Sequence, residues 1–174
     1  MSCGQTSQWA TPPGCWVWFD VNIPTPVLRH SFTLHIALGD VLELGEGRAG
    51  KRRIIPIIGG EALGPDITGE VLDLGADWQT VYRDGAAHLD TRYALRTADS
   101  ALIEVVNVGT RHGPPEIMAR LAAGDAVDPN SYTMRTAARL ETGSERYRWV
   151  NHTVFVCAGS RLPSGVEIAY YAVE

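Results

Sequence analysis

Hydrophobic and polar residues alternate along most of the chain after residue 30, and glycines interrupt the alternation at short intervals. In "SFTLHIALGD" the residues Phe32, Leu34, Ile36 and Leu38 occupy every second position. A period of two is typical of a β-strand with one buried face. Related patterns predict strands within the segments 31–40, 51–60, 67–85, 87–97, 101–112, 131–142, 147–162 and 166–174.

Two details refine this pattern. The region 67–85 is either one long bent strand or two strands, because Gly69 and Gly75 permit β-bulges. The segment "PPEIMARLAAG" opens with prolines, carries an acidic residue in its first turn and ends at Gly124, which predicts the single helix. About eight short antiparallel strands and one helix indicate an all-β fold, either a closed meander barrel or a sandwich. An eight-stranded barrel is just wide enough to hold one small ligand.

The first 30 residues follow no period and are rich in proline and tryptophan. We interpret 1–30 as an irregular N-terminal arm and 31–174 as a single β-barrel domain. The arm has large apolar side chains that are unfavourable in water, so it is expected to pack on the barrel or on a partner subunit. These side chains are Trp9, Trp16, Trp18 and Phe19. They favour a homodimer.

The net charge of −5 argues against nucleic-acid and anionic-membrane partners, which require a basic field. The compact basic run from Lys51 to Arg53 is interpreted as the solvated start of a strand. Three cysteines at irregular spacing suit a reducing compartment. The apolar run from Cys15 to Phe19 is too short for a signal-peptide core or a membrane span. We therefore expect a cytoplasmic protein.

Motifs for metal or nucleotide chemistry are missing from the sequence. The five histidines show no ligand spacing, and there is no Cys-x-x-Cys pair. The chain has neither a Gly-x-Ser-x-Gly nucleophile motif nor a phosphate-binding glycine loop. We therefore expect no metal and no cofactor.

Several sequence blocks occur in an order that resembles a known family. They include "ITGEVLDLGADWQ", "LDTRYALRT", "ALIEVVNVGTR" and "YRWVN". In this respect the chain is similar to the DUF3237 family, also called UPF0311, from about Phe32 to Val173. The resemblance implies a small barrel of lipocalin-like or streptavidin-like kind. It implies no catalytic motif, because the role of the family is largely unassigned.

Within these blocks, Asp77 is the first candidate for chemistry. It lies directly before Trp78 in "GADWQ", so that an indole neighbours the carboxyl group. A carboxyl group in an apolar cavity has a raised pKa, which suits proton transfer near neutral pH. The alternative is structural: Asp77 accepts hydrogen bonds from the backbone or from an arginine and helps to close the barrel.

The candidate substrate-binding residues come from strands in which one or two polar side chains stand among bulky apolar neighbours. This composition is typical of ligand pockets. Each also has a structural alternative. An aromatic residue can be part of the core, an amide can brace the backbone, and an arginine can form a surface ion pair instead of binding a carboxylate or polarising an enolate. The candidates are Trp78, Tyr93, Asn107, Arg111, Arg135, Trp149 and Asn151.

These features predict a cofactor-free enzyme that binds a small, mostly apolar or aromatic metabolite inside the barrel. We expect an isomerisation, cyclisation, cycloaddition or elimination, in specialised metabolism, with Asp77 as acid and base. Holding a reactive conformer can supply much of the rate acceleration without a nucleophile. The alternatives are a carrier or sensor for the same kind of ligand, and an interaction protein whose barrel is filled by its own side chains.

Overall fold

The computed structural model describes residues 22–174, and the tryptophans expected in the arm lie outside this range. The described chain forms nine strands, of which eight close into a barrel. The strands are β1 (Leu28–Leu38), β2 (Leu42–Glu46), β3 (Lys51–Leu63), β4 (Gly69–Val81), β5 (Ala87–Thr97), β6 (Leu102–His112), β7 (Thr133–Glu141), β8 (Phe155–Leu162) and β9 (Gly165–Val173).

Every neighbouring pair of strands is antiparallel, in the order β1-β9-β8-β7-β6-β5-β4-β3-β2. The barrel closes because β3 changes partner along its length. Its first part, from Lys51 to Ile54, pairs with the extra strand β2, whereas its second part, from Ile57 to Leu63, pairs with β1. The expected all-β barrel is thus confirmed. Region 67–85 contains one strand, β4, and its register shifts between Val71 and Gly75.

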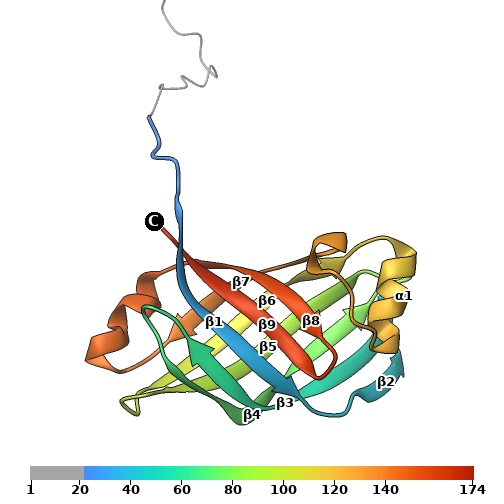
Figure 1. The fold of residues 1–174 in the computed structure, drawn as a ribbon, viewed down its shortest axis with the longest axis horizontal. Coiled ribbons are helices and arrows are strands. Elements are labelled where there is room, and N and C mark those ends of the chain that lie inside the picture. Colours follow the sequence, from blue (N-terminus) through green and yellow to red (C-terminus); the bar gives the residue numbers. More distant parts are fainter. Residues whose placement is uncertain (1–21) are drawn as a thin grey trace, which may run out of the picture.

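The two ends of the barrel are built differently (Figure 1). At the end that we call the mouth, the helix α1 (Pro115–Ala123) follows β6, and the β4–β5 and β8–β9 turns lie at the same end. The predicted helix is confirmed, and Gly124, in a left-handed conformation, caps its C-terminus. At the other end, which we call the base, β1 begins and β9 ends. The described chain enters the barrel at Leu28, so the strand starts slightly earlier than the expected arm boundary.

Aromatic side chains fill the half of the barrel near the base. Phe32 and Tyr170 stack with their ring centroids 4.5 Å apart, and Phe155 meets Phe32 edge to face at 6.1 Å. All three side chains are fully buried. Because packed aromatic rings leave little free space, this half of the barrel holds core and not a cavity.

The expected strand at 147–162 is only partly correct. Glu145–His152 forms the 3-10 helix η2, and β8 begins at Phe155. Tyr147 and Val150 are the buried residues of η2. They are three positions apart, the repeat that a 3-10 helix places on one side. In a short segment, alternating large and polar residues resemble a strand, and the helix forms here because its apolar side chains cover the base.

Candidate functional site

A small cavity lies inside the mouth half of the barrel. Its volume is about 30 Å³, enough for a water molecule or a small functional group. Its walls combine apolar side chains with two arginines, a carboxyl group, an amide and a hydroxyl. The lining residues are Ile36, Leu38, Ile57, Asp77, Gln79, Thr91, Arg111, Met134, Arg161, Val166 and Ile168.

Among the described residues 22–174, Asp77 is the only carboxyl group that lines this cavity, and only 9% of the residue is exposed. Its Oδ1 accepts a hydrogen bond of 3.2 Å from the backbone amide of Asp90, and its Oδ2 accepts one from Nε2 of Gln79. Loss of hydration raises the pKa of Asp77, while hydrogen bonds from Gln79 and Thr91 and the charge of Arg111 oppose that rise. The carboxyl group is therefore both braced and disposed to hold a proton.

Gln79 connects Asp77 to the neighbouring strand. Arg53 on β3 donates a hydrogen bond of 2.9 Å from its Nε to Oε1 of Gln79. Because Oε1 accepts from the arginine, Nε2 of the same amide is directed to Asp77. This chain of two hydrogen bonds fixes the orientation of the Asp77 carboxyl group.

Arg111 lies where the cavity meets a second hollow. Only 8% of the residue is exposed, and its Nε has no hydrogen-bond partner among residues 22–174. Burial lowers the pKa of Arg111 to about 10, and the positive charges of Arg53 and Arg161 act in the same direction. At neutral pH the guanidinium remains charged, buried and incompletely paired, which is an unfavourable arrangement unless a ligand completes it.

The second hollow is a groove between α1 and the β4–β5 turn. Its volume is about 330 Å³. Arg111 lines both this groove and the cavity. Arginines stand along one part of it, and small or apolar residues of α1 form the other. The lining residues are Arg53, Val81, Arg83, Asp84, Gly85, Arg111, Pro115, Met118, Ala119 and Ala122.

Of the residues predicted from sequence, Asp77 and Arg111 come together at the cavity, whereas Trp78 and Arg135 do not line it. Side chains alternate along a strand, so Trp78 faces away from Asp77, and Arg135 faces away from the buried Met134. Arg135 is exposed, and its Nη1 donates to the backbone oxygen of Met134 at 2.9 Å.

Tyr93 and Asn107 lie in the barrel interior but not in the cavity wall. The Tyr93 hydroxyl is hydrogen-bonded to the hydroxyl of Tyr170, and Nδ2 of Asn107 donates to the same Tyr170 oxygen at 3.2 Å. Burial raises the pKa of Tyr93 above its ordinary range, so the phenol stays protonated. These residues form a polar layer inside the barrel, alongside the packed aromatic core.

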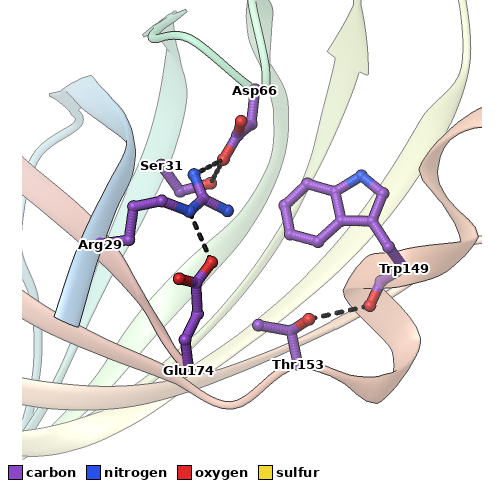
Figure 2. A network of polar contacts seen from close by, with 6 residues as sticks. All are labelled: Arg29, Ser31, Asp66, Trp149, Thr153 and Glu174. Atoms are coloured by element: carbon purple, nitrogen blue, oxygen red, sulfur yellow. Dashed lines mark hydrogen bonds and ion pairs between the residues drawn. The ribbon is translucent and has the colours of Figure 1, made fainter. Parts of the chain in front are cut away.

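Trp149 and Asn151 lie on η2 at the base, far along the barrel from α1. Asn151 forms two hydrogen bonds of 2.9 Å with the backbone of Thr142. Figure 2 shows the Trp149 indole turned toward a polar network at this end. In this network Arg29 contacts Asp66 at 2.7 Å and Glu174 at 2.6 Å. These two sequence candidates therefore belong to the closure of the base.

Sequence reasoning missed four polar residues near the cavity. Gln79 and Thr91 share a parity with inward-facing residues of their strands, so strand alternation was an available signal. Arg161 lies near the end of β8, after Gly159 and Ser160, and belongs to no recognisable motif. Arg53 was expected to be solvated, yet it is only half exposed and bonded to Gln79, because β3 and β4 are paired at Arg53 and Gln79.

Two absences apply to the described residues 22–174. No group of three or more histidine, cysteine, aspartate or glutamate side chains in that range is arranged to hold a metal ion. None of its helices is long and apolar enough to cross a membrane.

A closed antiparallel barrel with charged groups inside its mouth defines a small cavity-bearing β-barrel protein. The chain belongs to the DUF3237 family, whose model, described as a protein of unknown function, matches residues 26–173. It is 43% identical to a UPF0311 protein of Bradyrhizobium diazoefficiens over 150 residues, covering 86% of this chain and 98% of the relative. The predicted family membership is confirmed.

Solved structures show the same fold. A conserved protein of unknown function from Rhodopseudomonas palustris has a TM-score of 0.82 at 39% identity, covering 87% of this chain and 99% of that chain. An enzyme from Penicillium herquei has a TM-score of 0.67 at 23% identity, covering 88% and 99%. The second likeness is one of fold alone.

Proposed function

We propose that this protein is a cofactor-free enzyme that transfers protons within a small, mostly apolar metabolite and thereby catalyses an isomerisation, cyclisation or elimination. The observation that carries the proposal is the Asp77 carboxyl group, which lines an interior cavity under conditions that raise its pKa. A general base works best when its pKa is near the working pH. A buried carboxylate is also a stronger base than a hydrated one.

The chemistry needs only residues of the cavity. The Asp77 carboxylate removes a proton from an activated carbon, and the electron pair moves onto a substrate oxygen or a leaving group. Arg161, which lines the same cavity, stabilises the negative charge that develops there. In an isomerisation the proton then returns from Asp77 to another atom of the substrate, so no external reactant is required.

The cavity and the groove differ in volume, so each would hold a different part of a ligand. The cavity of about 30 Å³ receives only the reacting group. The groove of about 330 Å³ is in the size range of small-molecule sites, and it shares Arg111 with the cavity. A ligand would therefore lie in the groove and extend its reacting end past Arg111 to Asp77.

A carrier for an apolar molecule is the alternative, and the composition of the cavity favours the enzyme. A carrier gains affinity from apolar walls, whereas a buried carboxyl group and two arginines add an electrostatic cost. Such groups are expected where charge develops during a reaction.

The proposal can be tested with 5-nitrobenzisoxazole, a probe from which a base removes one carbon-bound proton while the nitrogen–oxygen bond breaks to release a coloured phenolate. The wild-type protein should accelerate this elimination, and Asp77→Asn should reduce the acceleration about 100-fold. The matched control is Asp73→Asn, since Asp73 is an exposed carboxyl group on the same strand. Equal rates for wild type and Asp77→Asn would contradict the proposal.

A further inference from the structure

We infer that the ligand of this site is an organic anion with an apolar body, and that Arg111 together with Arg53 binds its carboxylate or phenolate group. This inference rests on the proposed function only for the position of the site. It adds the chemical class of the ligand and separates the anchoring arginines from the reacting carboxyl group.

The first argument is local charge. The chain as a whole carries a net charge of −5, but the groups that interact around the cavity are Arg53, Arg111 and Arg161 against the single carboxyl group of Asp77. In the groove, Arg83 is accompanied by Asp84, so this pair adds no net charge. The site is thus a positively charged interior in an acidic protein, which attracts an anion.

The second argument is the unfulfilled hydrogen-bonding capacity of Arg111. The Nε of Arg53 is occupied by Gln79, and Arg161 donates to the backbone oxygen of Gly165 at 3.3 Å. By contrast, the buried Nε of Arg111 has no partner among residues 22–174. A planar carboxylate matches the two parallel N–H groups of a guanidinium and would supply the missing acceptor. It would also offset the mutual repulsion of the arginines.

The third argument is the shape of the groove beyond Arg111. On the α1 side its walls are Pro115, Met118, Ala119 and Ala122, which are apolar or small. Arg53 and Arg111 stand together in this groove, whereas Arg161 and Asp77 line the cavity. An anion held at Arg111 therefore keeps its apolar body along α1 and places neighbouring atoms near Asp77.

The experiment compares 2-naphthoate with 2-naphthamide, which have the same ring system and differ in charge. Isothermal titration of the wild-type protein should show about tenfold or tighter binding of the acid, the difference expected for charge-assisted hydrogen bonds. Arg111→Met should abolish the preference. Arg139→Met should retain it, because Arg139 is an exposed arginine on the outer face of β7. Equal binding of both probes to the wild type, or binding of neither, would overturn the inference.

A measurement on the unaltered protein guards against misfolding of Arg111→Met. In nitrogen-15-labelled wild type, the Nε resonance of Arg111 should shift on addition of 2-naphthoate and remain unchanged with 2-naphthamide. No shift with either probe would overturn the inference even if the variant fails to fold.

Asp77→Asn separates this inference from the proposed function. It should keep the preference for 2-naphthoate while losing the elimination activity. If the preference exists but no elimination depends on Asp77, the anion site stands and the enzyme proposal fails. If elimination depends on Asp77 but the acid and the amide bind equally, the enzyme proposal stands and the ligand class is wrong.

Discussion

The backbone amide of Asp90 on β5 donates a hydrogen bond of 3.2 Å to Oδ1 of Asp77 on β4, and the same Asp77 carboxyl group lines the interior cavity. The two roles considered for Asp77, bracing of the barrel and contact with an interior space, therefore coexist in one side chain. Both oxygens accept hydrogen bonds, so the group is held in place. This arrangement has a measurable consequence for stability.

The free energy of unfolding should depend on pH through Asp77. Its pKa is raised in the folded protein, so between the ordinary aspartate pKa and this raised value the folded state binds more protons than the unfolded state. The free energy of unfolding consequently falls as the pH increases through that interval. Asp77→Asn should remove this part of the decrease, whereas Asp73→Asn should not. Urea unfolding at a series of pH values measures this dependence. The same pH dependence of the free energy of unfolding in wild type and Asp77→Asn would show that Asp77 is not its source.

The two buried tyrosines should differ in their contribution to stability. Tyr170 bonds to both Tyr93 and Asn107, whereas the Tyr93 hydroxyl bonds, among residues 22–174, to Tyr170 alone. Tyr170→Phe should thus lower the free energy of unfolding by about 1–3 kcal/mol, and Tyr93→Phe by about 1 kcal/mol. Thermal or urea unfolding of both variants tests this order. A larger effect of Tyr93→Phe would show that Tyr93 has a more important partner.

Gly75 should not tolerate a side chain. Its φ is 133°, and an added Cβ would lie 2.1 Å from the backbone oxygen of Arg92 on the paired strand. Gly75→Ala should therefore lower the free energy of unfolding by about 2 kcal/mol or more. At Gly143, an added Cβ meets nothing within 4 Å, which makes Gly143→Ala the control. Similar stabilities for the two variants would contradict the close approach of β4 and β5 at this bulge.

Asn151 should affect the base of the barrel and not the mouth. Asn151→Ala removes two hydrogen bonds to Thr142 and should lower the free energy of unfolding by about 1–2 kcal/mol. Affinity for 2-naphthoate should remain within a factor of about two, because Asn151 is not in the cavity or groove. A strong loss of binding by a folded Asn151→Ala would place the ligand at the base instead.

Much of the fold could be predicted from local patterns. The alternation in β1 identified the inward set Phe32, Leu34 and Ile36, which are all buried, and the prolines and Gly124 marked α1. The pattern failed at Tyr147, where a 3-10 helix replaces the expected strand. Large residues at short spacing satisfy either structure, and the need to cover the base decides between them.

Prediction of the site was less complete. The alternation of side chains along a strand shows whether a residue faces the inside or the outside of the barrel, but it does not show how far along the barrel axis the residue lies. Asp77, Tyr93 and Asn107 all face inward, yet only Asp77 reaches the cavity. Asn107 instead joins the tyrosine layer.

The sequence by itself determined most of the strands, the helix and the family, because these depend on residues close together in the chain. The tertiary structure alone decided that Arg111 on β6 and Arg161 on β8 meet Asp77 on β4 at the mouth. This arrangement depends on strand register and on the closure of the barrel, in which β3 pairs first with β2 and then with β1. Charges from strands that are not neighbours converge only when the sheet closes on itself.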